Sequence, residues 1–233
     1  ASSGPLPFET HTIGRICVHD GNVTFREYRD SDYSDCEALV DNAWGFERHF
    51  HPNDLAALGR YLYTMGSAAM SNYRVVAEHD SKVIGFIFGY NERIPLPKHE
   101  LRKLSSRLAI LKRLLFMKGM AFREKIDFLN SMGAHEKNRT ALLKRGKSEI
   151  VLFVVHPTFQ GQGIGKKLFE GFRFFCEKAK VESIIVETNK MGASSFYERI
   201  GFTLIGDFDS PLHNYVTKNG QACLYEYLLQ HER

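Results

Sequence analysis

A glycine-rich turn between an apolar stretch and an amphipathic stretch, at residues 154–168, constrains the fold of this chain more than any other feature. Gly161, Gly163 and Gly165 occupy alternate positions, and glycine leaves the backbone N–H groups of a turn accessible. The helix expected after the turn contributes the positive end of its dipole. A strand, a bare turn and a helix N-terminus in this order form a cradle for a di-anion such as a pyrophosphate.

Two common phosphate-binding motifs do not match this spacing. A Walker P-loop requires glycine where Gln160 stands and Ser or Thr where Lys167 stands. A dinucleotide-binding fingerprint, G-x-G-x-x-G, requires glycine at Lys166 or at Leu168. The turn therefore belongs to neither of these classes of nucleotide site.

A third pattern fits both the turn and a segment further along the chain. Gln160, Gly163 and Gly165 fill Gln/Arg-x-x-Gly-x-Gly/Ala, which resembles the acyl-CoA loop of the GNAT superfamily of N-acetyltransferases. Residues 193–202, Ala-Ser-Ser-Phe-Tyr-Glu-Arg-Ile-Gly-Phe, resemble the second signature of that family. The resemblance is strong over residues 149–202. It implies an α/β fold, the α+β mixed sheet of the GNAT acyl-CoA N-acyltransferases.

Hydrophobic periodicity predicts the remaining elements in the order usual for that fold. A helix is predicted to begin at Asp30-Ser31-Asp32, which cap it, and to end near Trp44. The next helix, after residue 54, is predicted to carry Leu55, Leu58, Leu62 and Met65 on one face. The other elements predicted are strands at 23–28, 74–78, 82–89, 150–155 and 183–188 and a short helix at 193–200.

Residues 94–146 depart from the short link that usually joins the third and fourth strands of the family. Pro95 and Pro97 interrupt the chain, and an apolar row at helical spacing follows. The row consists of Leu101, Leu104, Leu108, Leu111 and Leu115. We interpret the segment as an insertion of two or three apolar-backed helices.

This insertion, at about residues 95–147, lies in a single domain predicted at 23–233, after an N-terminal extension at 1–22. From Lys98 to Lys147 there are 14 Lys or Arg residues against four Asp or Glu, so the outer helix faces are predicted to be basic. Such a face is either solvated surface, a platform for an acidic or phosphate-bearing partner, or a lid near the CoA phosphates.

The composition excludes several classes of protein. With 43% hydrophobic and 25% charged residues, the chain can bury a globular core. No apolar run approaches about 18 residues and no secretory segment is recognised, so neither a membrane span nor export is expected. Four cysteines without a C-x-x-C pair indicate reduced thiols and no zinc site, which is typical of a cytoplasmic protein.

The resemblance assigns the residues that bind acetyl-CoA. The backbone of Phe153, Val154 and Val155 is expected to pair with the pantetheine amides where two strands splay apart, while the side chains pack in the core. Asn189, one residue from the position where the family often has Asn, is predicted to contact the same arm. The pyrophosphate is expected at Gln160, Gly161, Gln162, Gly163, Ile164, Gly165 and Lys166.

Acyl transfer to an amine needs an oxyanion donor, a base and an acid for the departing thiolate. The Val155 amide is the expected oxyanion donor. Tyr197 stands where the family places its general acid, and its phenol is protonated at neutral pH; a packing role is the alternative. Glu149, eleven residues before Gln160, resembles the carboxylate base of the histone-acetylating branch, with an ordered water as the alternative. Glu187 and His156 are further candidates for the base.

These residues predict a cytoplasmic N-acetyltransferase that moves an acetyl group from acetyl-CoA to a primary amine by direct attack in a ternary complex. Neither motif contains a cysteine nucleophile, and no metal is implied. The acceptor, a small molecule or a protein amine, is not readable from the sequence. No membrane contact is expected, and the resemblance is compatible with a homodimer.

Two alternatives remain open from the sequence. One is a CoA-binding regulator without catalysis, which would keep Gln160 to Gly165 but would not depend on Tyr197. The other is a module that acts on a ribosomal protein or RNA through the basic insertion. Nucleic acid is disfavoured because no stripe of stacking aromatic residues alternates with the basic ones.

Overall fold

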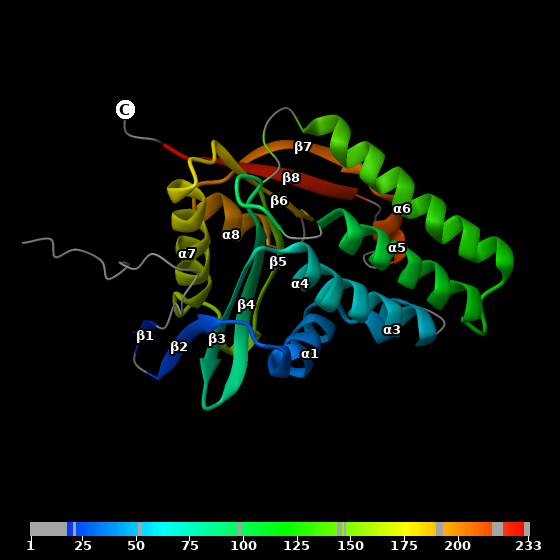
Figure 1. Ribbon diagram of the computed structural model, residues 1–233, viewed down its shortest axis with the longest axis horizontal. Helices are drawn as coiled ribbons and strands as arrows, with labels where there is room; N and C mark the ends of the chain where they lie inside the picture. The colour runs from blue at the N-terminus through cyan, green and yellow to red at the C-terminus, as the bar shows by residue number, and fades with distance from the viewer. Residues whose placement is uncertain are drawn as a thin grey trace, which may run out of the picture.

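The computed structural model describes residues 18–20, 22–50, 53–96, 99–143, 146, 148–189, 193–215 and 221–230. These residues build one eight-stranded mixed sheet in the order β1-β2-β3-β4-β5-β6-β8-β7 (Figure 1). Its neighbouring strands are antiparallel except for β5 and β6, which run parallel. The strands are β1 (Val18–Asp20), β2 (Val23–Glu27), β3 (Tyr73–His79), β4 (Lys82–Tyr90), β5 (Glu149–Val155), β6 (Ser183–Thr188), β7 (Thr203–Asp209) and β8 (Gln221–Leu228).

Eight α-helices and four short turns of helix join the described strands. The helices are α1 (Tyr33–Trp44), α2 (Phe46–His49), α3 (Asn53–Tyr61), α4 (Ser67–Met70), α5 (His99–Phe116), α6 (Phe122–Leu142), α7 (Ile164–Lys178) and α8 (Ser194–Arg199). The short turns are η1 (Asp30–Asp32), the π-helical η2 (Leu62–Gly66), η3 (Pro157–Phe159) and η4 (Pro211–Tyr215). No helix among these described residues is both long and apolar enough to span a bilayer.

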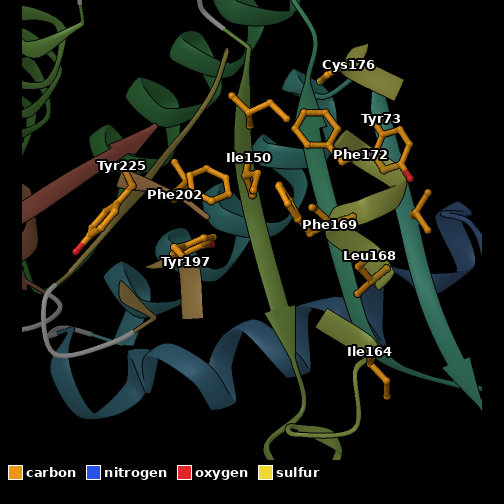
Figure 2. Close-up of a cluster of buried hydrophobic side chains, with 14 of the residues drawn as sticks. Tyr73, Ile150, Ile164, Leu168, Phe169, Phe172, Cys176, Tyr197, Phe202 and Tyr225 are labelled. Carbon is orange, nitrogen blue, oxygen red and sulfur yellow. The ribbon is translucent and has the colours of Figure 1, made fainter. Parts of the chain in front are cut away.

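The sheet separates two apolar cores. On one face, α7 packs Leu168, Phe169 and Phe172 against the strands. Figure 2 shows these side chains to the right of β5, and Tyr197 and Phe202 of the same core to its left. On the other face, helices α1 to α6 cover the strands through a second cluster that includes Phe46, Phe86 and Phe88. Complete burial of each such ring contributes roughly 1.5–3 kcal/mol, so the sheet is held rigidly from both sides.

The β3–β4 hairpin closes through two residues with left-handed backbone. Asp80 has φ 50° and Ser81 has φ 62°. Positive φ at both central positions is the conformation of a type I′ turn, whose twist matches that of the paired strands. The hairpin predicted around His79-Asp80-Ser81 is therefore confirmed, as are the strands predicted at 23–28, 150–155 and 183–188 within one residue or two.

The predicted helical face through Met65 is wrong at its end. Leu55 and Leu58 are buried as expected, but Met65 is 37% exposed. The helix changes to π geometry at Leu62–Gly66. A π turn adds a residue to the turn and rotates every later side chain away from the 3.6-residue period.

The predicted helix cap is confirmed in position, because Asp32 is the N-cap residue of α1, but its side chain bonds elsewhere. Its carboxylate makes no capping bond to α1 and instead accepts hydrogen bonds from the Arg29 backbone N–H and the Arg26 guanidinium. Asp32 lies in the turn between β2 and α1, where it forms a buried ion pair with Arg26.

The stretch predicted to hold two or three helices contains α5 and α6. The predicted apolar row is out of phase with the core, because Leu108, Leu111 and Leu115 are exposed while Ile110, Leu114 and Met117 are buried. Both sets recur at helical spacing, so periodicity alone could not select between them. The structure does not describe the side chains of Leu101 and Leu104.

Candidate active site

The opening between β5 and β6 lies at the centre of the sheet. Among the described residues these strands pair at two positions, Glu149 with Ile185 and Ile150 with Val186, and then separate. The register of β5 against β4 also shifts between Phe88 and Gly89. The divergence exposes one backbone edge of β5 beyond Ile150, which is the edge that an extended ligand with amide groups can pair with.

The backbone of Val155 faces this opening. The N–H of the next residue, His156, donates to the Ile84 oxygen of β4 at 2.8 Å. Because successive N–H groups of a strand alternate in direction, the Val155 N–H points away from β4, toward the side that β6 has left. The carbonyl of Val155 accepts a hydrogen bond from the Gln160 side chain at 3.1 Å.

The glycine loop follows directly. Gly161 has φ 78° and Gly163 has φ 81°, with open space where a Cβ would lie, and Gly163 is the N-cap of α7. Two of the three glycines thus adopt a left-handed backbone, which other residues rarely take. Gly165 serves packing instead, since a Cβ there would lie 3.3 Å from the Phe196 ring. The first N–H groups of α7 have no partner within the helix and face the loop.

Other polar side chains of the loop brace it or stand at its rim. The Gln162 amide donates to the Thr158 carbonyl at 3.1 Å. His156 caps the short turn η3, because its Nδ1 accepts from the Thr158 N–H. The Lys166 side chain is 69% exposed and lies 3.9 Å from Glu170. His156 therefore acts as a turn residue, and Lys166 carries its charge at the surface.

Tyr197 lies in the core on the α7 face. It is 4% exposed and belongs to a chain of aromatic contacts that starts on β5. Ring centroids are 5.5 Å apart for Phe153 and Phe196, and 5.4 Å apart for Phe196 and Tyr197. Burial raises the pKa of the Tyr197 phenol, so the group stays protonated well above neutral pH.

Glu149 lies on the opposite face, where it is ion-paired with Arg139 of α6. Burial raises the pKa of Glu149, and the Arg139 guanidinium only partly offsets that rise. The Nε of Arg139 also lies 3.2 Å from Glu187 of β6. One arginine thus joins the two strands just where they separate.

Glu187 has two further partners. The Nε2 atoms of His135, on α6, and His213, on η4, lie 3.4 and 3.2 Å from its carboxylate oxygens. Burial alone would raise the pKa of Glu187, but the hydrogen bonds from these histidines lower it to about 2. Burial also raises the pKa of the Tyr63 phenol, with a further rise from the charge of Glu187.

Three residues of this cluster, His135, Arg139 and His213, were not found by sequence reasoning. The spacing of four between His135 and Arg139, which places them on one helix face, was the only local signal. His213 lies in a connection that has no motif. The remaining predicted residue, Asn189, follows β6, and its Oδ1 is buried with no hydrogen-bond partner among the described residues.

Comparison with known proteins defines the class. Residues 129–209 match the family model of the acetyltransferase (GNAT) domain. SsHAT matches at 15% identity with a TM-score of 0.61, covering 90% of this chain and 100% of that one. PH1933 from Pyrococcus horikoshii OT3 matches at 17% identity with a TM-score of 0.55, covering 90% and 99%. No protein of curated function matches the sequence.

A further similar structure is that of yncA from Salmonella typhimurium with its cofactor acetyl-CoA. It is 13% identical, with a TM-score of 0.51, and the match covers 91% of this chain and 97% of that one. The mixed sheet with its opening is thus the fold of the acetyltransferases. The match to the GNAT domain model spans β5, the glycine loop, α7, β6 and α8.

Proposed function

We propose that the protein moves the acetyl group of acetyl-CoA to a primary amine by direct attack, with both substrates bound together. The observation that carries the proposal is the divergence of β6 from β5 immediately before the glycine loop. A peptide-like arm joined to a pyrophosphate needs an open strand edge and an anion cradle in this order. The Val155 N–H and the start of α7 supply them.

The residues present fit the pantetheine arm. Of the three predicted residues, Phe153 and Val155 offer their backbone to it, whereas the backbone of Val154 faces β4 and its side chain packs in the core. The buried Oδ1 of Asn189 can accept from an amide N–H placed in the opening, which would remove the cost of leaving it unbonded.

The glycine loop would hold the pyrophosphate mainly through backbone. Gln160 and Gln162 support this loop by bonding its flanking carbonyl groups, so the N–H groups from Gly161 to Gly165 stay available. Lys166 adds a charge contact at the exposed rim, which salt would weaken.

Two groups of the chain would act on the reacting atoms. The Val155 N–H would donate to the carbonyl oxygen as negative charge develops on it. Tyr197 would give its proton to the departing thiolate, and its raised pKa ensures that the proton is present at neutral pH. Phe196 lies between Phe153 and Tyr197, so one ring separates Tyr197 from this strand.

The base would lie on the opposite side of the sheet. We assign Glu149, acting directly or through an ordered water, because its raised pKa suits proton acceptance better than the lowered pKa of Glu187. Both carboxylates also attract a cationic amine to this side. The acceptor would therefore approach from the face covered by α1 and α6.

Direct attack is supported by the state of the thiols. Cys36, Cys176 and Cys223 are buried, and burial raises the pKa of Cys36 and Cys176. A buried protonated thiol is a poor nucleophile, so these three side chains are unsuited to carry an acetyl group.

The test is an acetyl-transfer assay with a panel of small and peptide amines, read by thiol release and by mass spectrometry of the acetylated product. The proposal expects at least one amine whose acetylation depends on both enzyme and acetyl-CoA. If CoA binds but no amine in the panel and no protein terminus is acetylated, the chain is a CoA-binding regulator and the proposal fails.

A further inference from the structure

Three metal-ligating side chains meet beside the opening, each from a different element. His135 comes from α6, Glu187 from β6 and His213 from η4. One ligand atom from each lies within 4.8 Å of the other two. Their side chains are 14%, 20% and 13% exposed, so the cluster is largely protected while remaining reachable by an ion.

The separations suit a tetrahedral ion. Zinc binds imidazole nitrogen and carboxylate oxygen at about 2.0–2.2 Å, so two ligand atoms on one ion lie about 3.4 Å apart. The Nε2 atoms of His135 and His213 lie 3.4 and 3.2 Å from the Glu187 oxygens. Each imidazole thus lies at the expected separation from one oxygen of the carboxylate, His135 from Oε2 and His213 from Oε1, and the three ligand atoms lie within 4.8 Å of one another.

The second nitrogen of each ring is held by the protein. His213 Nδ1 lies 3.4 Å from the Gln221 carbonyl oxygen, which can only accept, so this nitrogen carries the proton. Its Nε2 faces the Glu187 carboxylate, where a bound cation can take the place of a shared proton. His135 Nδ1 lies 2.8 Å from the Ser210 hydroxyl, and that oxygen also accepts from the backbone N–H of His213. Such outer contacts orient the histidines of metal sites.

The carboxylate is oriented in the same way. Arg139 Nε holds Oε2 of Glu187 at 3.2 Å, which leaves Oε1 on the His213 side for an ion. Counting Glu149, Glu187 and Arg139 with neutral imidazoles, the group carries one net negative charge (two carboxylates against one guanidinium). A divalent cation is therefore attracted to the centre of the group.

We propose that His135, Glu187 and His213 bind one divalent ion of the zinc type, which fastens α6 and η4 to β6 beside the acceptor side of the opening. Three protein ligands leave a fourth position for water or for an acceptor group. No sequence motif marks this site because its ligands are 52 and 26 residues apart (135 to 187 and 187 to 213). The inference is independent of acetyl transfer.

The test is calorimetric titration of ZnCl₂ into chain without a histidine tag, after removal of metals by a chelator. We expect one zinc per chain and binding weakened at least tenfold in His135→Gln and in His213→Gln. The matched control is His79→Gln, which removes an imidazole from β3 and should bind zinc like the wild type. Circular dichroism checks that each variant is folded.

A second measurement needs no variant. Co²⁺ bound to the wild type should give the intense visible absorption bands of a tetrahedral site with nitrogen and oxygen ligands. The proposal is overturned if the wild type shows no saturable zinc binding, which would mean that His213 shares only a proton with Glu187. It is equally overturned if zinc affinity persists in a folded variant that carries both His135→Gln and His213→Gln, or if Co²⁺ gives only weak octahedral bands.

Discussion

Arg26, which is buried, and Arg139, which is half-buried, each lie between two carboxylates, yet their surroundings differ. Arg26 donates to the two Asp32 oxygens at 2.7 and 2.9 Å and to Glu78 at 2.9 Å. Its partners lie on η1 and on β3, the strand paired with β2, so the group forms inside regular structure. Arg139 joins Glu149 to Glu187 across strands that are separating.

The difference shows in the charge of the carboxylates. Burial alone would raise the pKa of Asp32, but the hydrogen bonds from Arg26 lower it. Glu149, beside Arg139, has a raised pKa because burial outweighs the arginine. A carboxylate fully matched by its arginine stabilises a fold, whereas one that is only partly matched can exchange a proton. The first arginine is therefore structural, and the second lies beside the opening to which we assign the acceptor.

The largest effect is expected at the structural arginine. Arg26→Met leaves the Asp32 charge buried without its cation, which should destabilise the fold by about 3–5 kcal/mol in urea unfolding. The dissociation constant for CoA, measured on the folded fraction, should not change. A loss below about 1 kcal/mol would mean that this pair contributes no more than an exposed one.

The face opposite Arg139 should carry the proton donor. Tyr197→Phe should lower kcat about 100-fold with CoA affinity unchanged, because only the phenolic proton is removed. Tyr225→Phe is the matched control: it removes a phenol that donates to Glu198 in the same core, and it should keep kcat within about threefold of the wild type. Equal rates for wild type and Tyr197→Phe would return Tyr197 to a packing role.

Arg139→Met tests the other half of the comparison. It leaves Glu149 and Glu187 facing each other without the cation between them, which should raise the pKa of both carboxyl groups. We expect kcat/KM for the amine to fall about tenfold or more at saturating acetyl-CoA, while CoA affinity stays within about twofold. Stability loss without any change in amine kinetics would make Arg139 a second structural arginine.

The smallest expected effect is a change in stability with pH. Because the pKa of Asp32 is lowered in the fold, its charge adds stability above the ordinary value of 3.8, and this contribution disappears as pH falls below that value. Asp32→Asn should therefore be less stable than the wild type at pH 7, with the difference narrowing below about pH 4. Urea unfolding at several pH values measures it, and a difference independent of pH would exclude the linkage.

The glycine loop was predictable because it is local and made of backbone. The positions from Gln160 to Gly165 specify a loop that depends on few distant contacts, so a short pattern reports it. The strands were predictable for a similar reason, because a short run of apolar, β-branched residues such as Ile184–Val186 is typical of a buried strand.

The acceptor side was not predictable because side chains far apart in the chain build it. His135, Glu187 and His213 meet only after α6 and η4 dock on the sheet. The π turn before Met65 and the phase of α5 were missed for a related reason. Each depends on which of two apolar faces finds a partner, and that choice is made by packing.

Calorimetric titration of CoA into the folded chain, with Gly163→Val alongside, tests whether the glycine loop binds CoA. The φ of 81° at Gly163 is strained for a β-branched residue, so the variant should bind about tenfold more weakly or worse. Gly133→Ala, in α6 with open space around it, should bind like the wild type. We expect one saturable CoA site per chain; no heat from the folded wild type, or equal affinity in Gly163→Val, would show that the glycine loop does not bind CoA.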